Sequence, residues 1–176
     1  MGKRRLCVGK IVNGEAKIIT DGGYEYMNDK PAKRVNWVTI RLVKEKSVLY
    51  GRRKISTPKD AMELVNGFLE YCDREQLVVC SLDTKNQPTA MEVVSIGTVN
   101  SSLIHPREVF KTSILSNASS VIIFHNHPSG DPTPSNEDKN ITRRLKEAGE
   151  ILGIEVLDHI IVADDKFCSL KEQGVV

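Results

Sequence analysis

The stretch that decides the fold is residues 120–138, which read SVIIFHNHPSGDPTPSNED. Its first five residues form a short apolar run rich in β-branched side chains, which predicts a buried strand. Three prolines and one glycine then stiffen a loop, and a helix is expected from Asn136 onward. Two histidines therefore stand at the end of a buried strand, and an aspartate lies in the first turn of the next helix.

These residue types form a candidate metal site. His125 and His127 are separated by one residue, so on a regular strand their side chains point to the same face. Asp138 returns from the helix and adds a carboxylate. Three protein ligands of N and O type are typical of catalytic zinc, whereas a structural zinc site has four ligands, usually with thiolates. No cysteine lies in this stretch.

Other roles for the same residues stay open at this point. Histidines beside a loop of this kind can be packed or solvated without any metal. Ser135 and Asp138 have the spacing of a capping box, in which the serine side chain accepts from the backbone N–H of the third helical residue. Capping does not exclude catalysis, because a helix N-terminus can also face an active site.

The pattern His-x-His, seven residues, then Ser-x-x-Asp resembles the metal motif of the JAB/MPN metalloprotease superfamily. The fuller string over 125–135 is similar to the RadC-type branch, as are the flanking stretches 99–111 and 152–162. The resemblance runs from about Ser56 to the C-terminus. Asn126 stands where the eukaryotic pattern usually has Ser or Thr, and RadC-type proteins carry Asn there.

The resemblance implies a three-layer α/β/α sandwich with a mixed sheet. It also implies that His125, His127 and Asp138 bind Zn²⁺ and that a metal-activated water attacks an amide bond of a peptide or protein substrate. Ser135 could donate a hydrogen bond to the developing oxyanion.

By the same resemblance, a general acid/base lies upstream, at the start of the strand that follows the first helix of the domain. Glu75 fits that place, Glu92 is the second candidate and Glu108 the third.

Length and composition agree with one ordinary domain and a small appendage. The chain has 176 residues, of which 40% are hydrophobic. No apolar run approaches the length of a membrane span, and the N-terminus lacks the pattern of a signal peptide. The four cysteines form no Cys-x-x-Cys pair, which predicts reduced thiols in a cytoplasmic protein and argues against the zinc deaminases.

The formal net charge of +2 hides an asymmetry. Residues 1–54 contain 14 Lys and Arg against 5 Asp and Glu, a net +9, whereas residues 55–176 contain 11 against 18, a net −7. A basic arm on an acidic domain suggests weak nucleic-acid binding, although a solvated face or a self-docking arm explains it equally well. A second function therefore stays open: a non-enzymatic accessory factor in DNA repair or mobile-element maintenance, with a structural metal.

Residues 1–54 are expected to form a β-rich appendage, and residues 55–176 the RadC-type domain. The appendage should contain a hairpin at Asn13-Gly14, a strand at 38–43 and a pairing segment at 48–50. In the domain we expect helices at 58–72, 106–115 and 136–150, strands at 76–82, 90–99, 120–125 and 154–162, and a short last element at 167–170.

Two finer expectations concern the end of the domain. Ile141, Leu145, Ala148 and Leu152 should share the buried face of the last helix, and Gly149 and Gly153 should mark its fraying end. His159, between Asp158 and apolar residues, is expected to be structural rather than a ligand.

Overall fold

The computed structural model describes residues 9–12, 15–20, 23–25, 35–69, 72–97 and 104–176. The chain divides into two compact units, Met1–Ile40 and Arg41–Val176. In the first unit, an antiparallel sheet has the order β1-β2-β3, from β1 (Gly9–Val12), β2 (Glu15–Thr20) and β3 (Gly23–Glu25). Val12 pairs with Glu15, so the predicted hairpin is confirmed, although its Asn13-Gly14 connection lies outside the described residues.

The segment 35–50 contains neither helix nor strand, so the strands predicted at 38–43 and 48–50 are wrong. Trp37, Val38 and Ile40 are 103%, 79% and 69% exposed. A segment with alternating apolar residues forms a strand only where a partner strand completes its hydrogen bonds and another layer covers its apolar face. Neither described sheet includes this segment.

The second unit is built on a five-stranded mixed sheet of order β5-β4-β6-β7-β8. Only β6 and β7 are parallel, and the other neighbours are antiparallel. The strands are β4 (Gln76–Leu82), β5 (Pro88–Ile96), β6 (Ser120–Asn126), β7 (Glu155–Ala163) and β8 (Lys166–Ser169).

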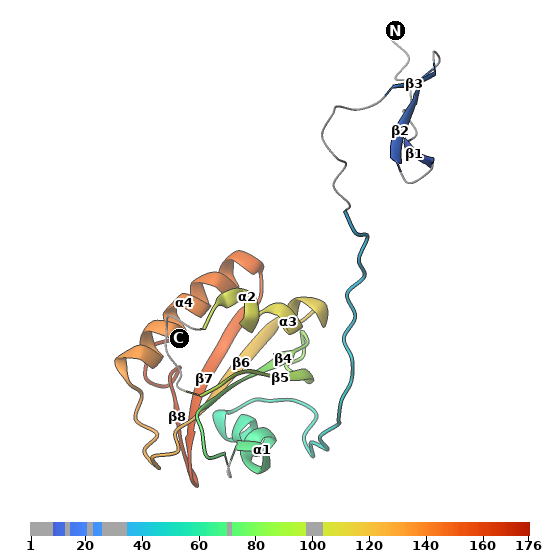
Figure 1. Ribbon diagram of the computed structural model, residues 1–176. Helices are drawn as coiled ribbons and strands as arrows, with labels where there is room; N and C mark the ends of the chain where they lie inside the picture. The colour runs from blue at the N-terminus through green and yellow to red at the C-terminus, as the bar shows by residue number, and fades with distance from the viewer. Residues whose placement is uncertain (1–8, 13–14, 21–22, 26–34, 70–71, 98–103) are drawn as a thin grey trace. The chain divides into compact units, whose positions relative to one another are not determined.

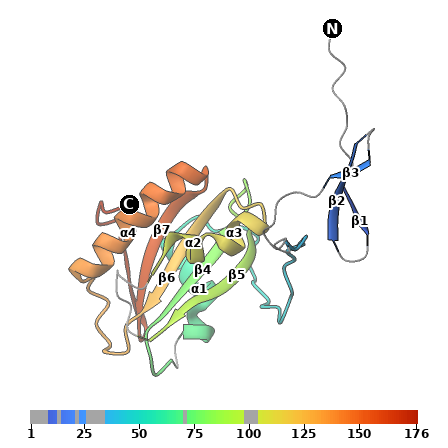
Figure 2. The ribbon, with the colours of Figure 1, turned by 45° about the horizontal axis from the view of Figure 1, so that its top comes forward.

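Helices lie on both faces of this sheet, which gives the expected α/β/α sandwich (Figures 1 and 2). They are α1 (Pro58–Leu69), α2 (Pro106–Val109), α3 (Lys111–Leu115) and α4 (Asn136–Leu152). The single helix predicted at 106–115 is two short helices that meet at the buried Phe110. In the described part of the chain, no helix is long and apolar enough to cross a membrane.

Two apolar cores sandwich the sheet, one on each face. The first joins α1 to residues such as Val78, Cys80, Ile122 and Phe124, and the second joins α4 to Leu77, Val79, Val121 and Ile123. Because alternate residues of a strand point to opposite faces, β4 and β6 are buried on both sides and consist mostly of apolar residues. His125 continues the series Val121, Ile123 and therefore lies on the face covered by α4.

The helix α4 approaches the sheet closely at Gly149. A Cβ there would lie 2.4 Å from the Ile154 carbonyl oxygen and 3.2 Å from the Phe110 ring, so Gly149 is a buried packing residue and not part of a fraying end. Gly153 does end the helix, in the left-handed conformation. Leu152 is 45% exposed, so its predicted place in the core is wrong.

We expect Gly149→Ala to lower the free energy of unfolding by about 1–3 kcal/mol, the usual cost of overpacking. The added methyl meets backbone, which cannot move aside as a flexible side chain can. The matched control is Gly67→Ala in α1, where nothing lies within 4 Å of the added Cβ, and the higher helix propensity of alanine should stabilise by up to about 1 kcal/mol. Urea unfolding measures both, and equal effects of the two substitutions would contradict the prediction.

Candidate metal centre

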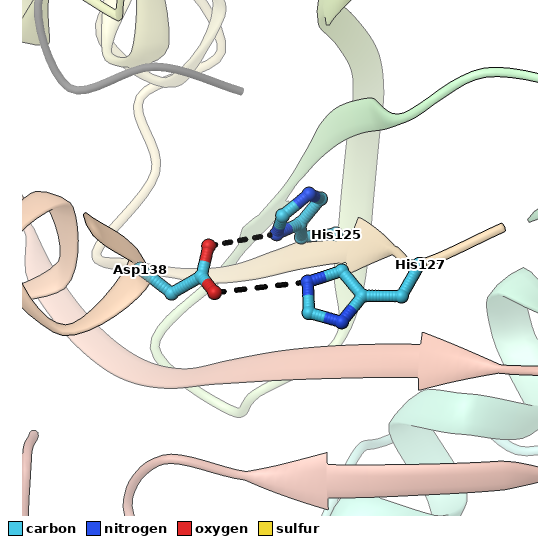
Figure 3. A group of neighbouring side chains, drawn as sticks. All are labelled: His125, His127 and Asp138. Carbon is cyan, nitrogen blue, oxygen red and sulfur yellow. Dashed lines mark ion pairs between the residues drawn. The ribbon is translucent and has the colours of Figure 1, made fainter. Parts of the chain in front are cut away.

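The structure brings the three predicted metal ligands together. His125, His127 and Asp138 each offer one ligand atom, and these atoms lie within 4.8 Å of one another. His125 Nδ1 is 3.2 Å from Asp138 Oδ1, and His127 Nε2 is 3.6 Å from Asp138 Oδ2 (Figure 3). Two ligands at about 2.1 Å from a tetrahedral zinc would be roughly 3.4 Å apart. The separations therefore fit donors that share one ion.

His127 is held in the orientation that a ligand requires. Its Nδ1 lies 2.8 Å from the Asp131 carbonyl oxygen. Because a carbonyl only accepts hydrogen bonds, Nδ1 carries the proton and donates it. Nε2 is then the nitrogen that faces Asp138, and it is the nitrogen left to bind a metal once the ring is neutral. Hydrogen bonds of this kind commonly fix the tautomer of metal-binding histidines.

His125 is buried, and its ring is poorly satisfied. The residue is 1% exposed, its Nε2 has no hydrogen-bond partner in the described structure, and its Nδ1 faces only the Asp138 carboxylate, at 3.2 Å. Burying a polar group without a partner is costly, and such groups are uncommon in folded proteins. A bound metal ion would satisfy one of these nitrogens, which is a reason to regard the cluster as a metal site.

Asp138 is oriented by the start of α4. Its backbone N–H donates to Ser135 Oγ at 3.1 Å, and the Ser135 backbone N–H donates to Asp138 Oδ2 at 2.7 Å. The predicted capping box is therefore confirmed. The Ser135 hydroxyl also donates to Asp138 Oδ2, at 2.7 Å. Since it has one hydrogen, the predicted oxyanion role, which stays a prediction, requires this hydroxyl to turn away from Asp138.

The electrostatics of the cluster keep Asp138 ionised. Burial works to raise the pKa of Asp138, but hydrogen bonding from His125, His127 and Ser135 outweighs it and holds the pKa below its usual range. The same contact with Asp138 raises the pKa of His127, against the effect of burial. The carboxylate is thus in the charged form that binds a metal.

Glu75 lies close to the ligand cluster. It is half-buried, directly before β4, and Leu77 of that strand pairs with His125. Continuing this antiparallel register by two residues brings Glu75 opposite His127, on the same face as Leu77. After the larger effects that involve Asp138, burial and Asp131, the charge of Glu75 adds to the raised pKa of His127.

The two other candidate carboxylates have partners elsewhere. Glu92 is on β5, so β4 lies between it and His125, and the Thr112 hydroxyl donates to it. Glu108 is on α2 and forms ion pairs with Lys111 and Arg107. Among the three, the geometry favours Glu75 as the group that could serve the metal site.

The loop between β6 and α4 is held by its own contacts. Gly130 has a φ of 79°, and a Cβ there would lie 2.8 Å from Asp164 Oδ2, in the turn between β7 and β8. The Asp131 carboxylate accepts from the backbone and hydroxyl of Thr133, at 2.9 and 2.7 Å. The two hydrogen bonds of Asp131 join protein groups, so they shape the loop that connects the ligand-bearing ends of β6 and α4.

A buried network behind Asp138 was not predicted. The Thr142 hydroxyl donates to the Asp138 carbonyl at 2.6 Å and lies 2.7 Å from His159 Nδ1. Because that hydroxyl has given its hydrogen to the carbonyl, Nδ1 is the donor. His159 is fully buried, with its ring centroid 6.2 Å from that of His125. It lies outside the ligand group, as its expected structural role requires.

His159 should make the metal-free protein sensitive to acid. Burial, with a further contribution from His125, lowers the pKa of His159 from the ordinary 6.5 to about 3. Between these values the unfolded chain binds a proton that the folded chain does not, so stability falls as the pH falls from 6.5 toward 3. The contribution approaches about 1.4 kcal/mol per pH unit.

We therefore expect His159→Gln to flatten the pH dependence of the free energy of unfolding below pH 6.5. Urea titrations with a chelator present measure the free energy of unfolding of His159→Gln and of the unsubstituted chain at each pH. The contributions of all other titrating groups are common to both proteins and cancel in the difference. His105→Gln, at the start of α2, is the control for the loss of a histidine elsewhere in the domain. Equal slopes for the unsubstituted chain and His159→Gln would refute the prediction.

The fold and site together define a class: an α/β domain of the JAB type, with two histidines at the end of a central strand and an aspartate on the next helix. The sequence matches the RadC-like JAB domain family over residues 55–175. The chain belongs to this family.

Three relatives show how far the similarity extends. The UPF0758 protein of Desulfitobacterium hafniense is 52% identical over 125 residues, 71% of this chain and 55% of the relative. That of Desulforamulus reducens is 57% identical over 122 residues, 69% and 54% of the two chains. That of Methanosarcina mazei is 50% identical over 125 residues, 71% and 55%. The matches thus span about half the length of these curated relatives.

Proposed function

We propose that residues 55–176 form a zinc-dependent hydrolase that cleaves an amide bond in a peptide or protein substrate. The observation that carries the proposal is the ligand cluster. His125 has no other partner for its ring nitrogens, His127 is fixed with Nε2 toward the cluster, and Asp138 is kept ionised. Membership in the RadC-like JAB family supports it.

The donor set agrees with a catalytic zinc. Two imidazoles and one carboxylate give three protein ligands, and no cysteine is among them, so a fourth position is left for water or substrate. When bound, zinc would lower the pKa of a water in that position to about 7 and polarise the substrate carbonyl.

The chain's own residues supply the proton transfers and the orientation. Glu75, beside His127, would accept a proton from the attacking water and pass it to the leaving amine. The ionised Asp138 and its cap with Ser135 hold the ligand geometry at the start of α4. The apolar side chains under the site, Leu77 and Ile123 among them, keep bulk water away from its inner side.

Metal analysis and an activity screen test the proposal together. Purified full-length protein should contain one zinc per chain, and it should cleave members of a peptide or isopeptide library in a chelator-sensitive manner. Iron as the stoichiometric metal would overturn the assignment, because two histidines and a carboxylate also suit Fe(II) oxygenases. Stoichiometric zinc without any amide cleavage would leave the metal site and overturn the hydrolase.

The charge asymmetry favours a second candidate, a non-enzymatic accessory factor in DNA repair or mobile-element maintenance that binds nucleic acid through residues 1–54. This arm carries a net +9. In its described part, Arg52 forms ion pairs with Asp60 and Glu63. Arg41, Lys44 and Arg53 are exposed. Exposed cations that neutralise phosphates give affinity without sequence preference.

If the arm binds nucleic acid, affinity should be weak and should fall steeply as salt is added, because bound counterions are released from the phosphates. Replacing Lys3, Arg4 and Arg5 by Gln in the full chain should reduce both the affinity and its salt slope. The control replaces three exposed cations of the domain, Lys59, Lys85 and Arg143. Fluorescence anisotropy with a short duplex measures both. Equal losses from the two triple substitutions, or no binding at all, would remove this candidate.

We also propose a cytoplasmic location. Within the described residues, Cys72, Cys80 and Cys168 are free thiols. Burial raises the pKa of Cys80 to about 12, so this thiol resists oxidation. A reducing compartment is where such unpaired cysteines normally persist.

A further inference from the structure

Asn126 stands between the two histidines and does not point into the ligand cluster. It is the last residue of β6 and is 4% exposed. Its Oδ1 accepts from the backbone N–H of Gln76 at 2.7 Å, and its Nδ2 donates to the Arg74 carbonyl at 3.0 Å. One side-chain amide therefore bridges to the neighbouring chain segment about 50 residues away.

The two hydrogen bonds fall on either side of Glu75. Arg74 precedes it and Gln76 follows it. A third bond fixes Glu75 itself, because its carbonyl accepts from the Gly97 N–H at 2.8 Å. Glu75 lies outside β4, beyond the first residue of that strand. The amide of Asn126 thus extends the order of the sheet to Glu75, whose charge acts on His127.

We propose that Asn126 is the positioning residue for Glu75: it sets the place of this carboxylate relative to His125 and His127 by clamping the backbone on both sides of it. The inference rests on the proposed function, in which Glu75 is the acid/base. Three consecutive residues then have separate roles: His125 and His127 are the ligands, and Asn126 between them fixes the position of Glu75.

The task requires an amide. A planar carboxamide presents one acceptor and two N–H donors on the same short side chain, and this site uses Oδ1 for Gln76 and Nδ2 for Arg74. An aspartate of the same shape accepts but cannot donate when ionised, so it would face the Arg74 carbonyl with a negative charge. An alanine reaches neither group and leaves both without these buried partners.

The test compares full-length protein carrying Asn126→Ala or Asn126→Asp with an exposed amide control, Asn140→Ala in α4. In the zinc-loaded protein we expect both Asn126 substitutions to lower kcat by about 10- to 100-fold, since small misplacements of a catalytic group have effects of that size. KM and zinc content should stay unchanged. Hydrogen exchange at the Gln76 amide should become faster, and Asn140→Ala should alter none of these quantities.

A second readout needs no substrate. In cobalt-substituted protein with ¹³C-labelled glutamate carboxyls, the Glu75 signal should carry a paramagnetic shift that decreases in Asn126→Ala. An unchanged shift, or an unchanged kcat despite faster exchange at Gln76, would overturn the positioning role. If the unsubstituted protein binds metal but cleaves no amide, the proposed hydrolase fails while this shift still decides the role of Asn126. If no metal binds, both fail.

Discussion

Replacing Glu75 by glutamine is expected to reduce turnover by about 10²- to 10⁴-fold, the range attributed to general acid–base catalysis, while the zinc content stays at one per chain. Glutamine keeps the size of the side chain and removes its ability to take a proton. The expectation rests on the position of Glu75 directly before β4, where the register of β4 and β6 brings it opposite His127.

The matched controls are Glu92→Gln and Glu108→Gln. Each removes the same charge from the same domain, but Glu92 is bound by Thr112 and Glu108 by Lys111, away from the ligands. Both should retain turnover within a few-fold of the unsubstituted chain. Steady-state hydrolysis of the best substrate from the library screen, with zinc measured on the same samples, decides the matter. Loss in Glu92→Gln and not in Glu75→Gln would reassign the acid/base to β5.

Replacing Asp138 by asparagine is expected to weaken zinc binding by more than 100-fold. Changes to groups that merely orient a ligand cost about 10- to 100-fold in metal affinity, and Asp138 is itself a proposed ligand. The substitution also removes the anionic group that faces both histidines.

Glu137→Gln is the control for this change. Glu137 is the neighbouring acid in the first turn of α4 and is exposed, so it removes the same charge from the same helix end without touching the cluster. Competition with a chromophoric zinc chelator measures both affinities. Equal affinities for Asp138→Asn and the unsubstituted chain would show that Asp138 is not a ligand, and equal losses in the two variants would point to a general effect of charge.

Sequence patterns predicted the sheet well where strands are buried on both faces. Most residues of the runs at 76–82 and 120–126 are apolar because both cores contact them, and the length of these runs excludes ordinary helices. The same reasoning failed at 38–43, where alternation was present but no partner strand was. Periodicity reports which residues are apolar, and it does not report whether another element covers them.

The candidate site was also predictable only in part. His125, His127 and Asp138 could be found because their spacing lies within one strand, loop and helix. The clamp by Asn126 could not, because its partners lie 50 and 52 residues away and depend on the register of β4 against β6. His159 was expected to be structural, but its bond to Thr142 could not be predicted for the same reason, since it joins α4 to β7.

The fixed loop between β6 and α4 has a consequence for the order of assembly. The hydrogen bonds from Thr133 to Asp131 and from Asp138 to Ser135 tie the ligand-bearing segments together through protein groups alone. In zinc fingers, by contrast, metal binding and folding are one event. The proposed metal would enter a chain that has already folded. When zinc is scarce, the folded protein would then persist in an inactive, metal-free form. Renewed zinc would activate it without new protein synthesis.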